Sequence, residues 1–219
     1  MKNYSIILGA VALGGLLGYG LGRYRAELFQ KRVTTFQNRG ESLVSETIAN
    51  NFGPPDYHLF NHLTLKLNES TTQIDHVLVS RFGVFVIETK DYKGWIFANP
   101  EQAQWTQVLF NGKRRFQNPI VQNKLHVQAV SSLLDFLPTE AIQSVVVFAG
   151  EAEFKSDVPR GVFTLSEMIN YLRGCQGEVM SINRMQFCVG RLEAERLAIS
   201  GETDVAHVAH LKQRRRLRE

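Results

Sequence analysis

The chain has 219 residues, a formal net charge of +4 and 44% hydrophobic residues. This length accommodates one sizeable domain with small additions, and this composition excludes wholesale disorder and a multi-span membrane protein. Much of the excess positive charge lies in the C-terminal run Arg214–Arg216 and in Arg218. Such a run is compatible with phosphate or anionic lipid as a partner, and equally with an ordinary solvated helix end.

Residues 4–22 form an uncharged, mostly apolar segment, with Lys2 before it and Arg23 and Arg25 after it. As a helix with about 1.5 Å rise per residue, the segment would span roughly 28 Å, close to the hydrocarbon thickness of a bilayer. The pattern predicts a single-pass transmembrane helix, and a cleaved signal peptide is the alternative. Because more positive charge follows the segment than precedes it, we expect the soluble part in the cytoplasm.

Small residues recur every four positions within this segment, at Ala10, Gly14, Gly18 and Gly22. Such a ridge lets two membrane helices approach closely, which predicts a homodimer. The alternative is that glycine is simply frequent in membrane helices.

A linker at residues 23–34 precedes a helix expected over residues 35–51, which Gly53-Pro54-Pro55 stops. Runs rich in β-branched and aromatic residues then predict strands. These runs are residues 57–67, 72–80, 84–90, 95–98, 105–110 and 113–117, with Asn111-Gly112 as a hairpin turn.

Asn118-Pro119 opens a helix that runs to about Phe136, and a buried strand follows at residues 144–149. A short strand is expected near residues 162–163, and helices around 166–172, 182–200 and 204–216. The order helix, strands, helix, strand predicts an α/β (α+β) fold with a mixed β-sheet flanked by helices. We expect the main domain at residues 35–150 and a mostly helical extension with a basic tail at 151–219.

The most informative segment joins two expected strands through a tight turn at Phe82-Gly83. Side chains alternate between the faces of a strand, so Glu88 and Lys90 point the same way. If Phe82-Gly83 is a two-residue loop, Asp75 lies opposite Lys90. The three polar side chains then share one face of the sheet.

Two carboxylates beside an amine suit phosphodiester hydrolysis assisted by a hard cation. The carboxylates supply oxygen ligands to Mg²⁺, while the lysine orients or deprotonates the attacking water and offsets developing negative charge. A partly exposed cross-strand salt bridge between Lys90 and an acid explains the same spacing without catalysis. Spacing alone leaves both interpretations open.

Several short motifs occur in a defined order around these residues. They are Gly40-Glu41, Gln73-Ile74-Asp75-His76-Val77, Ile87-Glu88-Thr89-Lys90, Gly94-Trp95 and Asn118-Pro119-Ile120-Val121-Gln122-Asn123, with His126 one helical turn further on. Together they resemble the nuclease-related domain (NERD) family of the PD-(D/E)xK, restriction-endonuclease-like superfamily. The resemblance covers about residues 36–150.

The resemblance implies a restriction-endonuclease-like fold and a metal-dependent site. The residues that it assigns to catalysis are Glu41, Asp75, Glu88, Lys90 and Gln122. Asp75, Glu88 and the main-chain carbonyl of Thr89 would bind Mg²⁺ or Mn²⁺. Glu41 would lie beside the metal, and Gln122 would approach the catalytic face.

We therefore expect a membrane-anchored, metal-dependent nuclease that hydrolyses phosphodiester bonds in nucleic acid, with DNA favoured over RNA. One alternative is a catalytically silent domain that binds nucleic acid or a protein partner at the membrane. Another is a membrane scaffold without a nucleic-acid role, which would show no binding even at low salt, where phosphate contacts are strongest.

A few further residues carry open alternatives. His126 is either a phosphate contact or a core or helix-capping histidine, and His76 is expected to pack on the other face of the sheet. Trp95 and Trp105 either stack on bases or belong to the core. The basic residues Lys113, Arg114 and Arg115 either contact a phosphate backbone or form a solvated turn.

Overall fold

The computed structural model describes residues 38–67 and 70–197. The expected transmembrane helix at residues 4–22, the linker at 23–34 and the helix expected at 204–216 lie outside these residues. No helix in the described part of the chain is both long and apolar enough to cross a membrane.

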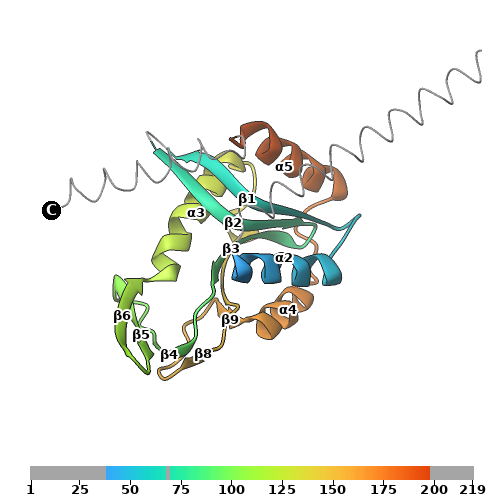
Figure 1. The fold of residues 1–219 in the computed structure, drawn as a ribbon. Helices are drawn as coiled ribbons and strands as arrows, with labels where there is room; N and C mark the ends of the chain where they lie inside the picture. Colours follow the sequence, from blue (N-terminus) through green and yellow to red (C-terminus); the bar gives the residue numbers. More distant parts are fainter. Residues whose placement is uncertain (1–37, 68–69, 198–219) are drawn as a thin grey trace, which may run out of the picture. The chain divides into compact units, whose positions relative to one another are not determined.

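A five-stranded mixed sheet forms the centre of the described residues (Figure 1). Its strands lie in the order β1 (Tyr57–Leu67), β2 (Ser70–Ser80), β3 (Gly83–Lys90), β7 (Ile142–Phe148) and β9 (Val162–Thr164). Strands β1, β2 and β3 are antiparallel neighbours, whereas β3, β7 and β9 run parallel. The continuous apolar run in β7 suits a strand that is covered on both faces.

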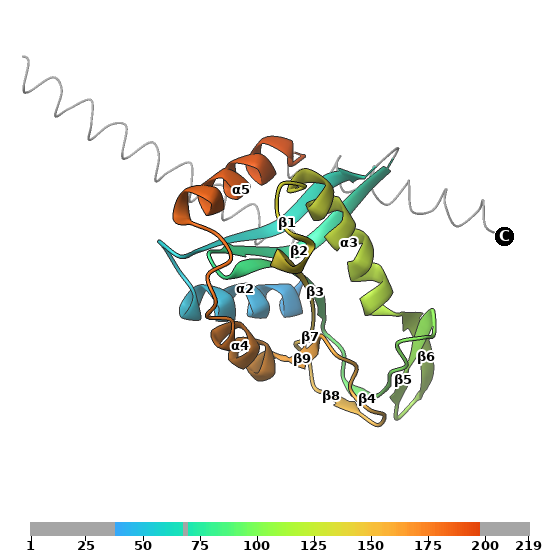
Figure 2. The same ribbon diagram turned by 180° about the vertical axis from the view of Figure 1, so that it is seen from behind.

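Helices cover both faces of this sheet (Figures 1 and 2). Apolar side chains of α2 (Arg39–Asn51) and α4 (Leu165–Gly174) pack on one face. Those of α3 (Pro119–Leu133) and α5 (Ile182–Glu195) pack on the other, and a 3-10 turn at Thr139–Ala141 leads into β7. The predicted mixed α/β class with flanking helices is confirmed.

A second sheet has four strands, whereas the sequence led us to expect a single mixed sheet. Its order is β6 (Gly112–Gln117), β5 (Gln104–Leu109), β4 (Gly94–Phe97) and β8 (Ala152–Phe154). Its inner face packs through Trp105 and Phe116 against Phe148 of β7. Strands β8 and β9 both come from residues after 150, so this part of the chain contributes to both sheets.

Both predicted hairpin turns lie one residue earlier than expected. The unpaired residues between β2 and β3 are Arg81 and Phe82, since Ser80 pairs with Gly83. Likewise, Gly112 pairs with the last residue of β5. Each glycine opens a strand with φ of 146° or 143°, a conformation that other residues rarely adopt. The predicted pairing of Asp75 with Lys90 was therefore wrong by two residues.

Strand β2 is continuous, but its pairing with both neighbouring strands is interrupted at Asp75. Its pairing with β3 ends at His76–Ile87, and its pairing with β1 skips Asp75, opposite His62. His62 has φ of 51°, which is uncommon outside glycine. Ile74 packs in the same cluster as Val77, although strict alternation would place these two on opposite faces. Asp75 therefore lies at a point of β2 that has no paired residue in either β1 or β3.

Candidate active site

The three residues of the expected signature converge at the end of β3. Lys90 Nζ donates to Glu88 Oε1 at 2.5 Å and to Gln122 Oε1 at 3.0 Å. The backbone N–H of Thr89 donates to Asp75 Oδ2 at 2.7 Å. The structure therefore brings Asp75, Glu88, Lys90 and Gln122 together.

Glu41 reaches the same site from the first turn of α2. Asn38 caps this helix by accepting a hydrogen bond from the Glu41 backbone N–H, and its side-chain amide donates to the Glu41 carboxylate. Arg39 makes a two-bond ion pair with Asp91, the residue after Lys90, at 2.8 and 3.0 Å. This ion pair connects the start of α2 to the end of β3.

Two glycines permit this close packing. A Cβ at Gly40 would lie 2.6 Å from the Asp91 Cβ, and a Cβ at Gly150 would lie 2.2 Å from the Tyr92 carbonyl oxygen. Both separations are far below van der Waals contact. The end of β3 can therefore meet α2 and the end of β7 only because neither position carries a side chain.

Two asparagines, Asn118 before α3 and Asn123 within it, have defined hydrogen-bond partners. Asn118 caps the helix, and its amide donates to the carbonyls of Pro100 and Gln102 in the loop between β4 and β5. Asn123 donates to the carbonyls of Val86 and Val145 at 2.9 and 3.2 Å, which ties α3 to β3 and β7. Sequence reasoning assigned no role to Asn123; the available signal was an amide on the helix face that must pack against the sheet.

His126 connects Glu88 to β2. Its Nε2 lies 3.1 Å from Glu88 Oε2, and its Nδ1 lies 2.7 Å from the Thr72 hydroxyl. An ionised carboxylate can only accept, so Nε2 carries the hydrogen, and Nδ1 of a neutral ring then accepts from Thr72. His126 is buried and contacts Glu88 and Thr72, as expected of a core histidine, and a contact with a substrate phosphate stays a prediction.

Burial and charge divide the acidic groups into two kinds. Burial and the charges of Glu88 and Glu41 raise the pKa of Asp75 well above its usual range, and burial with the Glu88 charge raises the pKa of Glu41 to about 7. Burial also acts to raise the pKa of Glu88, but the His126 hydrogen bond and the Lys90 charge hold it below its ordinary value. The result is one ionised pair, Glu88–Lys90, beside two carboxyls that resist ionisation until more positive charge arrives.

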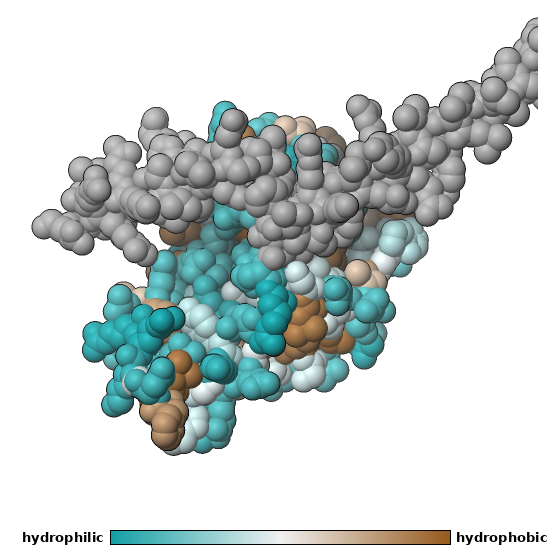
Figure 3. Space-filling view, in the orientation of Figure 1, coloured by the Kyte–Doolittle hydropathy of each residue, from teal (hydrophilic) through white to brown (hydrophobic). Residues whose placement is uncertain are grey.

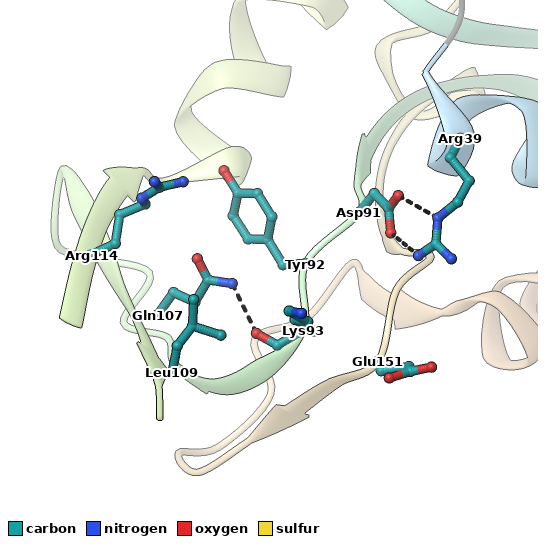
Figure 4. Close-up of a pocket in the computed structure, with 8 residues that line it drawn as sticks. All are labelled: Arg39, Asp91, Tyr92, Lys93, Gln107, Leu109, Arg114 and Glu151. Atoms are coloured by element: carbon teal, nitrogen blue, oxygen red, sulfur yellow. Dashed lines mark hydrogen bonds and ion pairs between the residues drawn. The ribbon is translucent and has the colours of Figure 1, made fainter. Parts of the chain in front are cut away.

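A cavity of about 580 Å³ opens beside Asp91, the residue that follows Lys90 (Figure 4). Figure 4 shows Arg114 and Gln107 reaching from the second sheet toward Tyr92 and Lys93. Arg39 and Asp91 line it on the side of the site. The lining also includes Lys93, Arg114 and Glu151, so two cations and one carboxylate lie beside the Arg39–Asp91 ion pair and the cavity is weakly positive.

The structure also gives the locations of the other residues that the sequence analysis named. Trp105 is buried in the core, whereas Trp95 is exposed. His76 is buried on the α2 side, where it bonds to Asn61 at 2.9 Å, and burial lowers the pKa of His76 to about 3. Lys113 and Arg115 lie on the outer face of the second sheet, opposite Arg114. The prediction that His76 faces away from Asp75 fits these contacts.

The donor set for a cation consists of oxygens. Asp75 Oδ1 has no hydrogen-bond partner among the described residues, and each Glu88 oxygen retains a free lone pair beside its one hydrogen bond. Within residues 38–67 and 70–197, no three or more His, Cys, Asp or Glu side chains are grouped to hold a metal. A cation here would have two carboxylates, main-chain oxygen and water as ligands, which suits Mg²⁺.

Comparisons with known proteins concern the same part of the chain. The model of the nuclease-related domain (NERD) family matches residues 37–149, just over half of the chain. An uncharacterized protein of Bacillus anthracis is 40% identical over 97 residues, which are 44% of this chain and 45% of that protein. The chain thus matches this curated relative over less than half of the relative's length. No solved structure matches the chain.

Proposed function

Because this chain belongs to the nuclease-related domain family, we propose that it is a metal-dependent nuclease that hydrolyses phosphodiester bonds in nucleic acid. The observation that carries the proposal is the convergence of Asp75, Glu88 and Lys90, with Gln122 on Lys90. A cross-strand salt bridge alone does not explain why the half-buried Asp75 lies near two further carboxyls, where burial and their charges raise its pKa.

Asp75, Glu88 and the Thr89 carbonyl would hold a divalent cation, Mg²⁺ or Mn²⁺. When bound, such a cation polarises a phosphodiester and makes a coordinated water a better nucleophile. Its charge would also favour the ionised forms of Asp75 and Glu41, whose pKa values are raised.

The chain's own residues would position water and phosphate. Lys90 is held by Glu88 and Gln122, so its ammonium has a fixed direction from which to orient the attacking water and to offset developing charge. His126 keeps Glu88 in place from the other side. Lys93 and Arg114 in the adjacent cavity would bind neighbouring phosphates of the strand.

To test the proposal, the purified full chain is incubated with labelled single-stranded DNA, duplex DNA and RNA, and cleavage is measured with Mg²⁺ or Mn²⁺ and with EDTA. We expect metal-dependent cleavage that falls at least ~100-fold in Asp75→Asn and Lys90→Ala, because each change removes electrostatic stabilisation of the transition state. Asp135→Asn and Lys66→Ala alter exposed residues away from the site and serve as controls. Cleavage that survives in Asp75→Asn and Lys90→Ala would contradict the assignment.

A silent binding domain is the second candidate. It is favoured by the mutual satisfaction of Glu88, Lys90, Gln122 and His126, which resembles a structural network as much as a catalytic one. This candidate predicts nucleic-acid binding without turnover in every metal. In titration calorimetry, it also predicts that the Asp75→Asn change does not abolish any heat of Mg²⁺ or Mn²⁺ binding that the wild type shows.

A further inference from the structure

The outer face of the second sheet exposes two aromatic rings, Trp95 and Phe97 of β4. Their side chains are 49% and 43% exposed, whereas Ile96 between them is buried. Alternation along the strand thus turns both rings away from the core, which Trp105 and Phe116 fill from the inner face. Two neighbouring exposed rings on one face indicate an interaction surface.

Each exposed ring shares a cross-strand row with a cation. Trp95 pairs with Val108, which pairs with Lys113. In the next row, Phe97 pairs with Thr106, which pairs with Arg115. Neighbouring strands lie about 4.8 Å apart, so a ring and its cation are separated by roughly 10 Å across the sheet. The face therefore presents an aromatic strand parallel to a basic edge strand.

A third cation lies at the opposite side of Trp95. Lys155 Nζ is 5.0 Å from the Trp95 ring centre, and Lys155 also pairs with Glu153. This contact steadies the indole and neutralises the one acidic side chain that the pairing register of β8 places beside it. The net charge around the two rings is positive.

Hydrogen-bonding groups complete the face. A hollow of about 360 Å³ is lined by Gln104, Thr106 and Arg115, together with Gln102 and Ala103. Figure 3 shows apolar atoms set among hydrophilic ones where Figure 1 places β4, β5 and β6. The surface is thus mixed in character.

We propose that this outer face, formed by Trp95, Phe97, Lys113 and Arg115, binds single-stranded nucleic acid. Bases stack on the two rings, and phosphates lie along Lys113 and Arg115. Sheets with exposed aromatic side chains on one face bind unpaired bases in this way. Every base has a face that can stack on an aromatic ring, and the phosphates of the strand are attracted to positive charge. The amides and hydroxyl of the hollow supply partners for base edges.

The charge and polarity of the face favour this occupant over a lipid surface or a second copy of the chain. A lipid interface would gain from a broad aliphatic area, whereas the face sets one aliphatic residue, Val108, beside Trp95 and the polar Thr106 beside Phe97. A second copy would bring the same basic edge against itself. Duplex nucleic acid is disfavoured because its bases are already stacked.

This surface is separate from the candidate active site and does not require cleavage. Arg114 and Gln107 point from the inner face of the same sheet into the cavity beside Asp91, whereas Lys113 and Arg115 point outward. The surface would hold a strand while another part of it is cut, and it would also serve a domain that does not cut at all.

Fluorescence anisotropy of a labelled oligothymidylate of about 15 nucleotides, the size of one binding site, tests the proposal with the full chain in detergent and EDTA. We expect W95A/F97A to weaken binding by roughly 30-fold or more, since two stacking partners are lost. K113Q/R115Q should weaken binding and reduce its salt dependence. Trp95→Phe, which keeps a ring, should retain most of the affinity. Phe187→Ala and Arg184→Gln on α5 are the matched controls and should bind like the wild type.

The outcomes separate this surface from the nuclease proposal. Oligonucleotide binding by the wild type, without cleavage when Mg²⁺ or Mn²⁺ is added, supports the surface and contradicts the nuclease proposal. The surface proposal is overturned, even if cleavage is intact, when W95A/F97A and K113Q/R115Q bind the oligonucleotide with the affinity of the wild type. Thermal melting checks that both variants are folded. A change confined to self-association in sedimentation or to binding of anionic vesicles also overturns the surface proposal.

Discussion

Burial and charge make Glu41 sensitive to pH in the neutral range. Its folded-state pKa is raised to about 7 from an ordinary value of 4.5, so the folded state binds this proton more tightly than the unfolded state does. Stability from this group is therefore complete below pH 4.5 and is lost as the pH rises toward 7. The cost is moderated by solvent, because Glu41 is only partly buried.

We expect Glu41→Gln to remove this loss. Urea unfolding should show the variant more stable than wild type by ~1–2 kcal/mol at pH 8 and nearly equal to it at pH 4.5. Glu46→Gln, an exposed change on the same helix, controls for helix propensity. Parallel stability curves for wild type and Glu41→Gln between these pH values would refute the assigned environment of Glu41.

His126 is a positioning residue, and its partner Thr72 allows a test that leaves the carboxylates intact. Thr72→Val removes the hydroxyl that fixes the ring, which leaves a buried nitrogen unpaired at a cost of about 1–3 kcal/mol. If the chain cleaves nucleic acid, kcat should fall several-fold with KM unchanged, because Thr72 lies behind the histidine. Ser132→Ala removes an exposed hydroxyl on α3 and should change neither quantity.

For individual residues, the sequence predicted which side chains of the site meet but not the strand register that brings them together. Asp75, Glu88 and Lys90 were predicted to converge, and they do. The pairing register was missed because the glycines open strands rather than occupy the turns. The Thr72–His126–Glu88 connection joins β2, α3 and β3, and contacts of that sequence separation leave no local pattern.

The junction of β3 with its neighbouring elements depends on Gly150, and this dependence can be measured. In Gly150→Ala the new Cβ would meet the Tyr92 backbone, which cannot move without shifting the end of β3. We expect a loss of ~2 kcal/mol or more of unfolding free energy, in line with other overpacked sites. Gly190→Ala places a methyl in open space on α5 and should instead stabilise by about 0.5–1 kcal/mol. Equal effects of the two changes in urea melts would contradict the packing.

Element boundaries followed from local chemistry where caps and turns marked them. Asn118-Pro119 starts α3 as predicted, and the β-branched runs became strands. Strand β8 was missed because Ala152–Phe154 is too short to show a period. The separation into two sheets was missed for another reason: periodicity identifies strands but does not say which of them pair.

For the molecule as a whole, residues from two regions build the framework around the site. The family match ends at residue 149, yet β8 and β9 follow it and join one sheet each. The division of the chain at residue 150 stays a prediction, because pairing alone does not define an independently folding domain. The exposed rings of β4 and the cations of β6 lie on one face because both strands pair with β5. Their shared surface could not be predicted from the sequence, which does not show which strands pair.

Attachment to a membrane through residues 4–22 is a proposal at the scale of the whole chain. An uncharged apolar segment of this length gains enough by leaving water to hold the chain in a bilayer, and the basic residues after it favour a cytoplasmic location of the following domain. We expect the full chain in the membrane fraction, resistant to alkaline carbonate, and a variant lacking residues 1–22 in the soluble fraction with its thermal melting retained. A variant lacking residues 198–219 separates the two basic regions: it should stay in the membrane, because removing surface charge weakens lipid attraction but leaves the apolar segment inserted. Release of the full chain by carbonate, or of the variant lacking residues 198–219 by salt, would show that charge rather than insertion holds the protein to lipid.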